Sequence, residues 1–227
     1  MPTPITRSQI TIRSATVADL PEIRNVSLDI YDRKSSIWRY VGLRAKDYLP
    51  VYEQIERHMD LNTCAIAVLP NGNVVGFFIT LPWVAKLDFT NANKASRDVH
   101  GILHSMDSWF LDNVLAKKRR SPKTVLRLLA NGTADGYEGL GLNQALRSYA
   151  VAKAIQAGWD MLVAETAEPM VQRLLRDVDK FDFGSQVLYD EFEIDGQRPF
   201  KGRRGGVVLF YTDLASQLSS KKPVARL

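Results

Sequence analysis

The feature that most constrains this chain is its central segment, where an apolar run leads through a glycine-containing turn directly into an alanine-rich helix. The run from Thr124 to Asn131 predicts a buried strand, and the residues from Leu142 to Ala157 predict the helix. Gly139 and Gly141 stand between them and let the backbone approach a ligand closely. Because a helix N-terminus presents free N–H groups that favour negative charge, the segment is predicted to bind a phosphate group.

The turn differs from the common nucleotide-binding motifs. No Gly-Lys-Ser or Gly-Lys-Thr follows the glycines, so the turn is not a P-loop. The dinucleotide pattern Gly-x-Gly-x-x-Gly, with an acidic ribose ligand downstream, is missing as well. Two interpretations remain at this point: a cradle for another phosphate-bearing ligand, and a tight strand-to-helix turn without a ligand.

Apolar periodicity on both sides of the segment predicts one mixed α/β domain. Strands are expected at residues 9–13, 63–69, 74–81, 124–131, 161–166, 186–194 and 206–212. Helices are expected after the capping box Thr16-x-x-Asp19 and at residues 46–59, 99–116, 142–157 and 169–179, with 86–97 as a loop. Pro50 fits its helix only within the first turn. No repeat or linker divides the chain, so we expect a single domain at 9–214 between tails at 1–8 and 215–227.

The bulk properties favour an ordinary globular protein of the cytoplasm. Hydrophobic residues make up 45% of the 227 residues and charged residues 24%, which excludes a disordered or disulfide-built chain. No window approaches the roughly 18 uninterrupted apolar residues of a membrane span, and the N-terminus lacks a secretory pattern, so no membrane association is expected. The single cysteine, Cys64, lies in an apolar run and is expected to be a buried thiol in a reducing compartment.

The net charge of +5 is modest, and its densest part is the run from Lys117 to Arg120. No aromatic residue is interleaved there for stacking on bases, so we expect a solvated loop and no nucleic-acid partner. The alternative role of this run is to attract a polyanionic ligand such as a phosphorylated cofactor.

The central segment resembles the phosphate-binding motif of the GNAT superfamily of acyl-CoA-dependent N-acetyltransferases. In that family a strand is followed by an aromatic residue, then Arg/Gln-x-x-Gly-x-Gly/Ala and a helix, and the amides of the turn bind the pyrophosphate of coenzyme A. Tyr137, Gly139 and Gly141 match the aromatic residue and the two commonest glycine positions. Ala145 and Leu146 match the small and large residues that follow, and the resemblance extends over about residues 10–213.

The resemblance implies a fold and a cosubstrate. The GNAT fold is an α/β fold with a central mixed, mostly antiparallel sheet of about seven strands and flanking helices. One inserted helix around residues 101–107 is most similar to the arylalkylamine and dopamine N-acetyltransferase branch. Acetyl-CoA or another acyl-CoA would be the cosubstrate and a small primary amine the acceptor, with no metal, in a monomer or homodimer. The residues assigned to coenzyme A are Thr133, Glu138, Gly139, Leu140, Gly141, Leu142, Asn143 and Gln144.

Three positions depart from the family pattern. Glu138 replaces the usual Arg or Gln, and because its carboxylate would repel phosphates it is expected to point outward or to weaken binding. Asn143 replaces the usual small residue. Leu175 stands where the family has the tyrosine that protonates the departing thiolate, and no tyrosine lies in residues 166–183. A second hypothesis is therefore a GNAT-fold protein that binds acyl-CoA as a sensor or scaffold without turnover.

Amine attack on a thioester needs a neutral amine, so a base is expected near the split between the fourth and fifth strands. Asp32, after the first helix, matches the stretch that carries a carboxylate in the arylalkylamine branch and is the first candidate. Glu165, at the end of the fifth strand, is the second. A backbone N–H within 131–133 is expected to hold the oxyanion. His100 and His104 have a metal-like i, i+4 spacing, but no further ligand is evident and surface histidines are expected.

Overall fold

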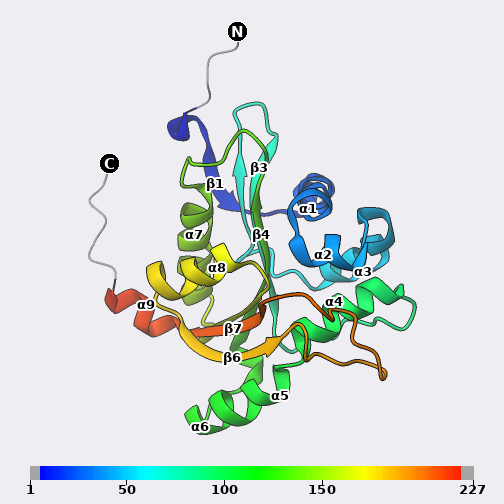
Figure 1. The fold of residues 1–227 in the computed structure, drawn as a ribbon. Coiled ribbons are helices and arrows are strands. Elements are labelled where there is room, and N and C mark those ends of the chain that lie inside the picture. The colour runs from blue at the N-terminus through cyan, green and yellow to red at the C-terminus, as the bar shows by residue number, and fades with distance from the viewer. Residues whose placement is uncertain (1–5, 221–227) are drawn as a thin grey trace.

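The computed structural model describes residues 6–220, which form one seven-stranded sheet with helices on both faces (Figure 1). Across the sheet the strand order is β1-β2-β3-β4-β5-β7-β6, and every neighbouring pair is antiparallel except β4 and β5. The mixed, mostly antiparallel sheet predicted from the sequence is therefore confirmed. The strands are β1 Thr11–Ser14, β2 Ala65–Val68, β3 Val74–Pro82, β4 Val125–Thr133, β5 Met161–Thr166, β6 Asp182–Leu188 and β7 Gly206–Asp213.

The alternating side chains of the strands divide the interior into two apolar cores. One core lies under α1, α3 and α4 and receives Val125 and Val163 from the sheet, whereas the other lies under α7 and receives Leu126 and Leu162. Figure 1 shows α1 and α7 on opposite sides of β4.

The α-helices are α1 Leu20–Lys34, α2 Ser36–Val41, α3 Ala45–His58, α4 Lys94–His104, α5 Asp107–Phe110, α6 Ala116–Lys118, α7 Leu142–Gln156, α8 Pro169–Arg173 and α9 Leu214–Ser220. π-helical turns at Leu111–Leu115 and Leu174–Val178 continue α5 and α8.

β4 and β5 run parallel at their starts and then separate. Their last paired residues are Leu128 and Ala164. The pairing of β4 with β3 also skips Leu129 at a β-bulge, which bends the strand and leaves main-chain groups outside the ladder. The sheet is therefore open between β4 and β5 near their carboxyl ends, which is the end at which the turn into α7 begins.

The structure corrects several helix predictions. α2 is an additional helix whose start is capped by Ser35, because its hydroxyl accepts from the backbone N–H of Trp38. α4 begins inside the stretch 86–97 that was expected to be a loop, because Asn93 caps its start. The helix expected at 99–116 is broken after His104, and Pro50 lies inside α3 beyond the first turn.

The chain ends and the last strands also differ from expectation. β6 covers Asp182–Leu188 rather than 186–194, because its pairing with β7 begins at Asp182. α9 includes residues assigned to the C-terminal tail, and a short 3-10 turn at Arg7–Gln9 lies partly in the N-terminal one. Residues 1–5 and 221–227 of those tails lie outside the described residues. Within 6–220, no helix is both long and apolar enough to cross a membrane. Cys64 is buried as expected, and burial raises the pKa of its thiol to about 11.

Candidate active site

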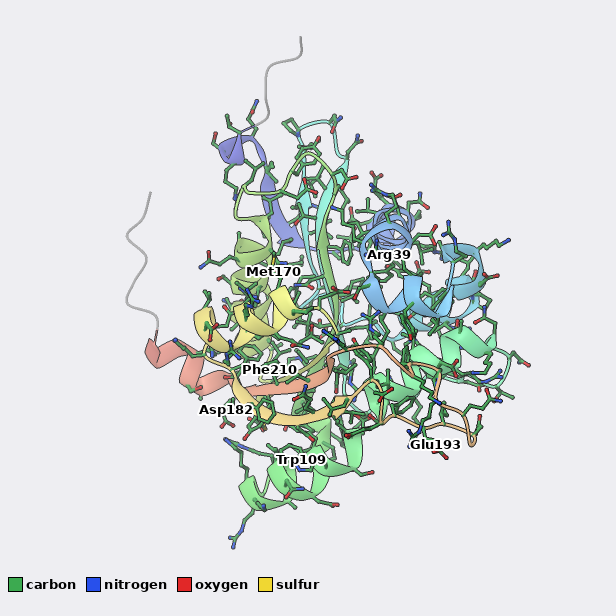
Figure 2. All side chains as sticks on the ribbon, in the orientation of Figure 1. Arg39, Trp109, Met170, Asp182, Glu193 and Phe210 are labelled. Atoms are coloured by element: carbon green, nitrogen blue, oxygen red, sulfur yellow. The ribbon has the colours of Figure 1, made fainter. Side chains whose placement is uncertain are left out.

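A cleft of about 460 Å³ opens where β4 and β5 separate. Residues 128–133 and 164–168 line the space between the strands. α1 contributes Tyr31 and Lys34 from one face of the sheet, and α8 with its π-helical turn contributes Met170 and Leu175 from the other. Met170, labelled in Figure 2, is 82% exposed. The cleft therefore passes through the plane of the sheet and connects its two helical layers.

The turn into α7 leaves its backbone open beside the cleft. Gly139 and Gly141 have φ of +77° and +69°, which side chains rarely adopt, and a Cβ added at either would meet nothing within 4 Å. Gly141 is the N-cap of α7, and neither a side-chain cap nor an acidic residue of the first turn is present there. The first N–H groups of α7 therefore lack intrahelical partners, and no acidic side chain lies in the first turn of the helix, which suits an anion.

The other residues predicted to bind coenzyme A occupy varied positions. Leu142 is buried in the core under α7, and Leu140 packs against the same core. Gln144 lines a separate cavity of about 370 Å³. Asn143 lines the cleft and accepts a hydrogen bond of 3.0 Å from the side-chain amide of Asn131, which ties α7 to β4. These side chains mainly support the turn, so ligand contacts there would come chiefly from the main chain.

Thr133 and Glu138 line the cleft from the end of β4 and from the turn. The Glu138 carboxylate pairs with the Lys34 ammonium at 2.7 Å and accepts a 2.7 Å hydrogen bond from the backbone N–H of Gly136. Its side chain is 54% exposed. Glu138 is therefore partly exposed, but it does not point away from the cleft, because Lys34 holds it there.

Glu165 lies in the cleft wall with only 5% of its side chain exposed. Its Oε1 atom is 3.3 Å from a guanidinium nitrogen of the equally buried Arg127, and it accepts no hydrogen bond among the described residues. Burial raises the pKa of Glu165, and the positive charge of Arg127 opposes this effect. A buried carboxylate with a raised pKa in the cleft wall is suited to accept a proton from a ligand in the cleft.

Arg127 connects Glu165 to polar side chains from the α4–α5 region. Its guanidinium donates to Asp107 and contacts the His104 ring, and the His104 Nδ1 atom lies 3.2 Å from Asp107 Oδ2. Sequence reasoning missed this group. The available signal was Arg127 itself, the single charged residue in the mostly apolar strand that precedes the glycine turn.

The prediction that both histidines lie on the surface is wrong. His100 is buried, and its Nε2 atom lies 2.7 Å from the Tyr48 hydroxyl. Burial lowers the pKa of His100 and keeps the ring neutral. The His104 ring stacks on His100 with centroids 5.7 Å apart. No group of three or more potential metal ligands occurs in residues 6–220.

Asp32, the first candidate for the base, is not brought to the cleft. Its Oδ1 atom accepts a 3.1 Å hydrogen bond from the backbone N–H of Ala45, and Oδ2 lies 3.0 Å from the Arg44 guanidinium. These contacts join the end of α1 to the start of α3. Asp32 therefore stabilises a helix start, and of the two predicted carboxylates the structure places only Glu165 in the cleft.

Leu175, at the position of the family's acidic tyrosine, is fully buried and lines the cleft. Tyr31 lines the same cleft from α1, and its ring lies 5.0 Å from that of Trp38. Burial raises the pKa of the Tyr31 hydroxyl well above its ordinary value. Tyr31 therefore stays protonated and can donate a hydrogen bond, although it is a poor acid.

Solved structures share this fold. The C-terminal condensation domain of Ebony in complex with β-alanyl-dopamine has a TM-score of 0.77 at 14% identity, covering 90% of this chain and 98% of that one. Arylalkylamine N-acetyltransferase 2 from Aedes aegypti has a TM-score of 0.68 at 10% identity, covering 90% and 99%. A Salmonella typhimurium protein solved with its cofactor acetyl-CoA has a TM-score of 0.54 at 16% identity, covering 91% and 94%. The predicted GNAT fold is confirmed.

A match to a protein family covers the first part of the chain. The model described as Epstein-Barr virus nuclear antigen 3 (EBNA-3) matches residues 3–132, which is more than half of the 227 residues. The matched region includes β1 to β3 and nearly all of β4, but it ends before the glycine turn and α7. No curated protein matches the sequence.

Proposed function

We propose that this chain, which belongs to the Epstein-Barr virus nuclear antigen 3 (EBNA-3) family and has the GNAT fold, is an N-acyltransferase that transfers an acetyl or other acyl group from acyl-CoA to a small primary amine. The observation that carries the proposal is the cleft between β4 and β5, which links the uncapped start of α7 to the buried carboxylate of Glu165. Amine acylation needs an anchor for the donor's phosphates and a proton acceptor near the thioester. The open start of α7 supports the first role, and the buried Glu165 carboxylate supports the second.

In the proposed reaction, the main chain of residues 138–144 holds the diphosphate, and the pantetheine arm lies between β4 and β5. The amine approaches from the side of α1, where Tyr31 lines the cleft. Glu165 removes a proton from the ammonium group, and the neutral nitrogen attacks the thioester carbonyl carbon. A main-chain N–H freed by the bulge at Leu129, slightly earlier in β4 than expected, stabilises the oxyanion.

Collapse of the tetrahedral intermediate breaks the carbon–sulfur bond and releases the amide and the coenzyme A thiolate. The nitrogen's surplus proton passes to the thiolate, directly or through water, because Leu175 has no proton to give. Glu165 then releases to solvent the proton that it took from the ammonium group. The same leucine favours the second candidate, an acyl-CoA sensor without turnover. A thiol-release assay with arylalkylamines, polyamines and amino acids separates the two, since only a transferase releases coenzyme A in response to an amine.

Replacing Gly141 with valine is expected to weaken acetyl-CoA binding at least tenfold. A β-branched residue disfavours a φ of +69°, and its methyl groups would enter the open space next to the first N–H groups of α7. Isothermal titration calorimetry of acetyl-CoA measures the effect. Gly158→Val is the matched control, because Gly158 has a φ of +81° and equally open surroundings beyond the other end of α7. Failure of the wild-type protein to bind acetyl-CoA at millimolar concentration would refute the proposed function.

A further inference from the structure

Three oxygens surround the Lys34 ammonium at the cleft, and all of them belong to the protein. Nζ lies 2.7 Å from Asp135 Oδ1, 2.7 Å from Glu138 Oε1 and 3.3 Å from the carbonyl oxygen of Thr133. An ammonium has three N–H donors, so this arrangement can occupy all of them. Lys34 is the last residue of α1, whereas its partners belong to the end of β4 and to the turn before α7. The lysine therefore bridges two walls of the cleft.

The two carboxylates are ionised partners of this lysine. Hydrogen bonds from Lys34 lower the pKa of both groups, and Arg33 adds to the effect on Asp135, whose pKa falls to about 2. The second oxygen of Glu138 accepts from the backbone N–H of Gly136. Asp135 thus has two cationic partners, whereas Lys34 is the single cationic partner of Glu138 in the described part of the chain.

A diphosphate seated on the glycine turn would lie near Glu138, which lines the same cleft. Like charges repel, so the turn alone is a poor site for a doubly charged group. Lys34 can offset this repulsion because its pair with Glu138 is exposed, with 37% and 54% of the two side chains accessible. Exposed ion pairs contribute little to stability, so little free energy is lost when Lys34 gives up Glu138. The diphosphate carries two negative charges where Glu138 carries one, so exchange of the partner is favourable.

We infer that Lys34 is the cation that pairs with the diphosphate of the acyl donor, and that Glu138 occupies this cation until the donor binds. The inference rests on the proposed function, because acyl-CoA supplies the diphosphate. During binding a phosphate oxygen replaces the Glu138 carboxylate at Nζ, while Asp135 and Thr133 keep the lysine at the cleft. The donor therefore competes with the Glu138 side chain for Lys34, and this competition lowers the affinity for the donor.

Calorimetric titration of coenzyme A into the full chain tests this exchange. Lys34→Gln is expected to raise the Kd about tenfold, because a charge-assisted contact to phosphate is lost. Glu138→Gln is expected to lower the Kd about threefold, because the competing charge is removed while an amide oxygen still accepts from Gly136. In the double variant the gain from Glu138→Gln should be smaller than in the wild-type background, since the lysine is no longer there to be released.

Two controls separate this exchange from a general effect of charge. Pantetheine, which lacks the diphosphate, should bind the wild type and all three variants with equal affinity. Lys46→Gln and Glu53→Gln make the same charge changes at exposed positions of α3 and should alter the Kd of coenzyme A by less than about twofold.

The other possible results contradict either the inference about Lys34 or the proposed function. Coenzyme A binding that Lys34→Gln leaves unchanged would overturn the inference, while the proposed function would stand. Weaker binding by Glu138→Gln would also overturn it, because Glu138 would then act by shaping the turn. An equal gain in both backgrounds would show that Glu138 acts by repulsion alone and would overturn the exchange at Lys34. If the wild type binds no coenzyme A, both the proposed function and the inference fail.

Discussion

Replacing Glu165 with glutamine is expected to lower kcat for amine acylation by about 10²–10⁴-fold while the Kd of acetyl-CoA changes little. Glutamine has nearly the same shape, but its amide cannot accept the proton that the attacking amine must lose. The effect should be large because Glu165 is the buried carboxylate in the cleft wall whose pKa is raised. Steady-state thiol release at saturating acetyl-CoA measures kcat, and calorimetry measures the Kd.

The pH profile provides a second readout for Glu165. Burial raises the pKa of this carboxyl group, so kcat/KM should fall as the pH drops through the raised pKa and should level off above it. In the Glu165→Gln protein this limb should disappear, and only the limb due to the amine substrate should remain. An unchanged acidic limb would show that another group is the base.

Asp32→Asn is the matched comparison, because it removes the other carboxylate that the sequence suggests as a base. Asparagine retains an oxygen that can accept the hydrogen bond from the backbone N–H of Ala45. This variant is therefore expected to keep most of the activity. The reverse pattern, with activity lost in Asp32→Asn and kept in Glu165→Gln, would assign the base to Asp32 and contradict the proposal.

The contrast between these two carboxylates shows which parts of a site can be predicted from local sequence. The glycine turn is a local feature: the positive φ values of Gly139 and Gly141 and the start of α7 involve neighbouring residues only. Asp32 was placed by its position after the first helix, but its direction depends on how α3 packs against α1. A hydrogen bond to Ala45 turns it away from the cleft, and no local pattern indicates that bond.

The partnership of Arg127 with Glu165 depends on register between two strands that are distant in the sequence. Parallel pairing sets Arg127 beside Val163, so Glu165 follows two residues later on the same face of the sheet. A one-residue shift would place one of the two charges on the other face. His100 is a similar case, because its burial depends on the contact between α4 and Tyr48 of α3. Sequence periodicity predicts these elements, but it does not predict which polar side chains meet between them.

Replacing Arg127 with methionine is expected to lower the free energy of unfolding by about 3–5 kcal/mol at pH 7. Methionine fills similar space, but Glu165 then loses its single cationic partner in the described part of the chain and stays buried. Asp107 loses a donor as well. Urea denaturation at constant pH measures the change. Arg44→Met is the control, because Arg44 is exposed and its pair with Asp32 is worth at most about 1 kcal/mol.

The pH dependence of this loss distinguishes an unpaired buried charge from simple loss of packing. Without Arg127 the pKa of Glu165 in the folded protein rises further above its ordinary value of 4.5, so folding takes up a proton. The free-energy cost of burying the charged Glu165 carboxylate is absent at pH values below its pKa in the unfolded chain. This cost grows as the pH rises toward the pKa of Glu165 in the folded protein. Asp107 adds to this pH dependence in the same direction, because removing Arg127 raises its pKa in the folded protein. Although burial alone would raise its pKa, the hydrogen bond from His104 and the charge of Arg127 outweigh burial and lower it in the wild type.

The difference in unfolding free energy between wild type and Arg127→Met should therefore be larger at pH 7 than at pH 5. Adding Glu165→Gln to the variant should recover part of the loss at pH 7, because the buried group is then neutral, and should recover less at pH 5. A loss that is equal at both pH values and unaffected by Glu165→Gln would mean that Arg127 contributes through its packing. The Arg127–Glu165 contact would then have no part in keeping the Glu165 carboxylate ionised in the cleft.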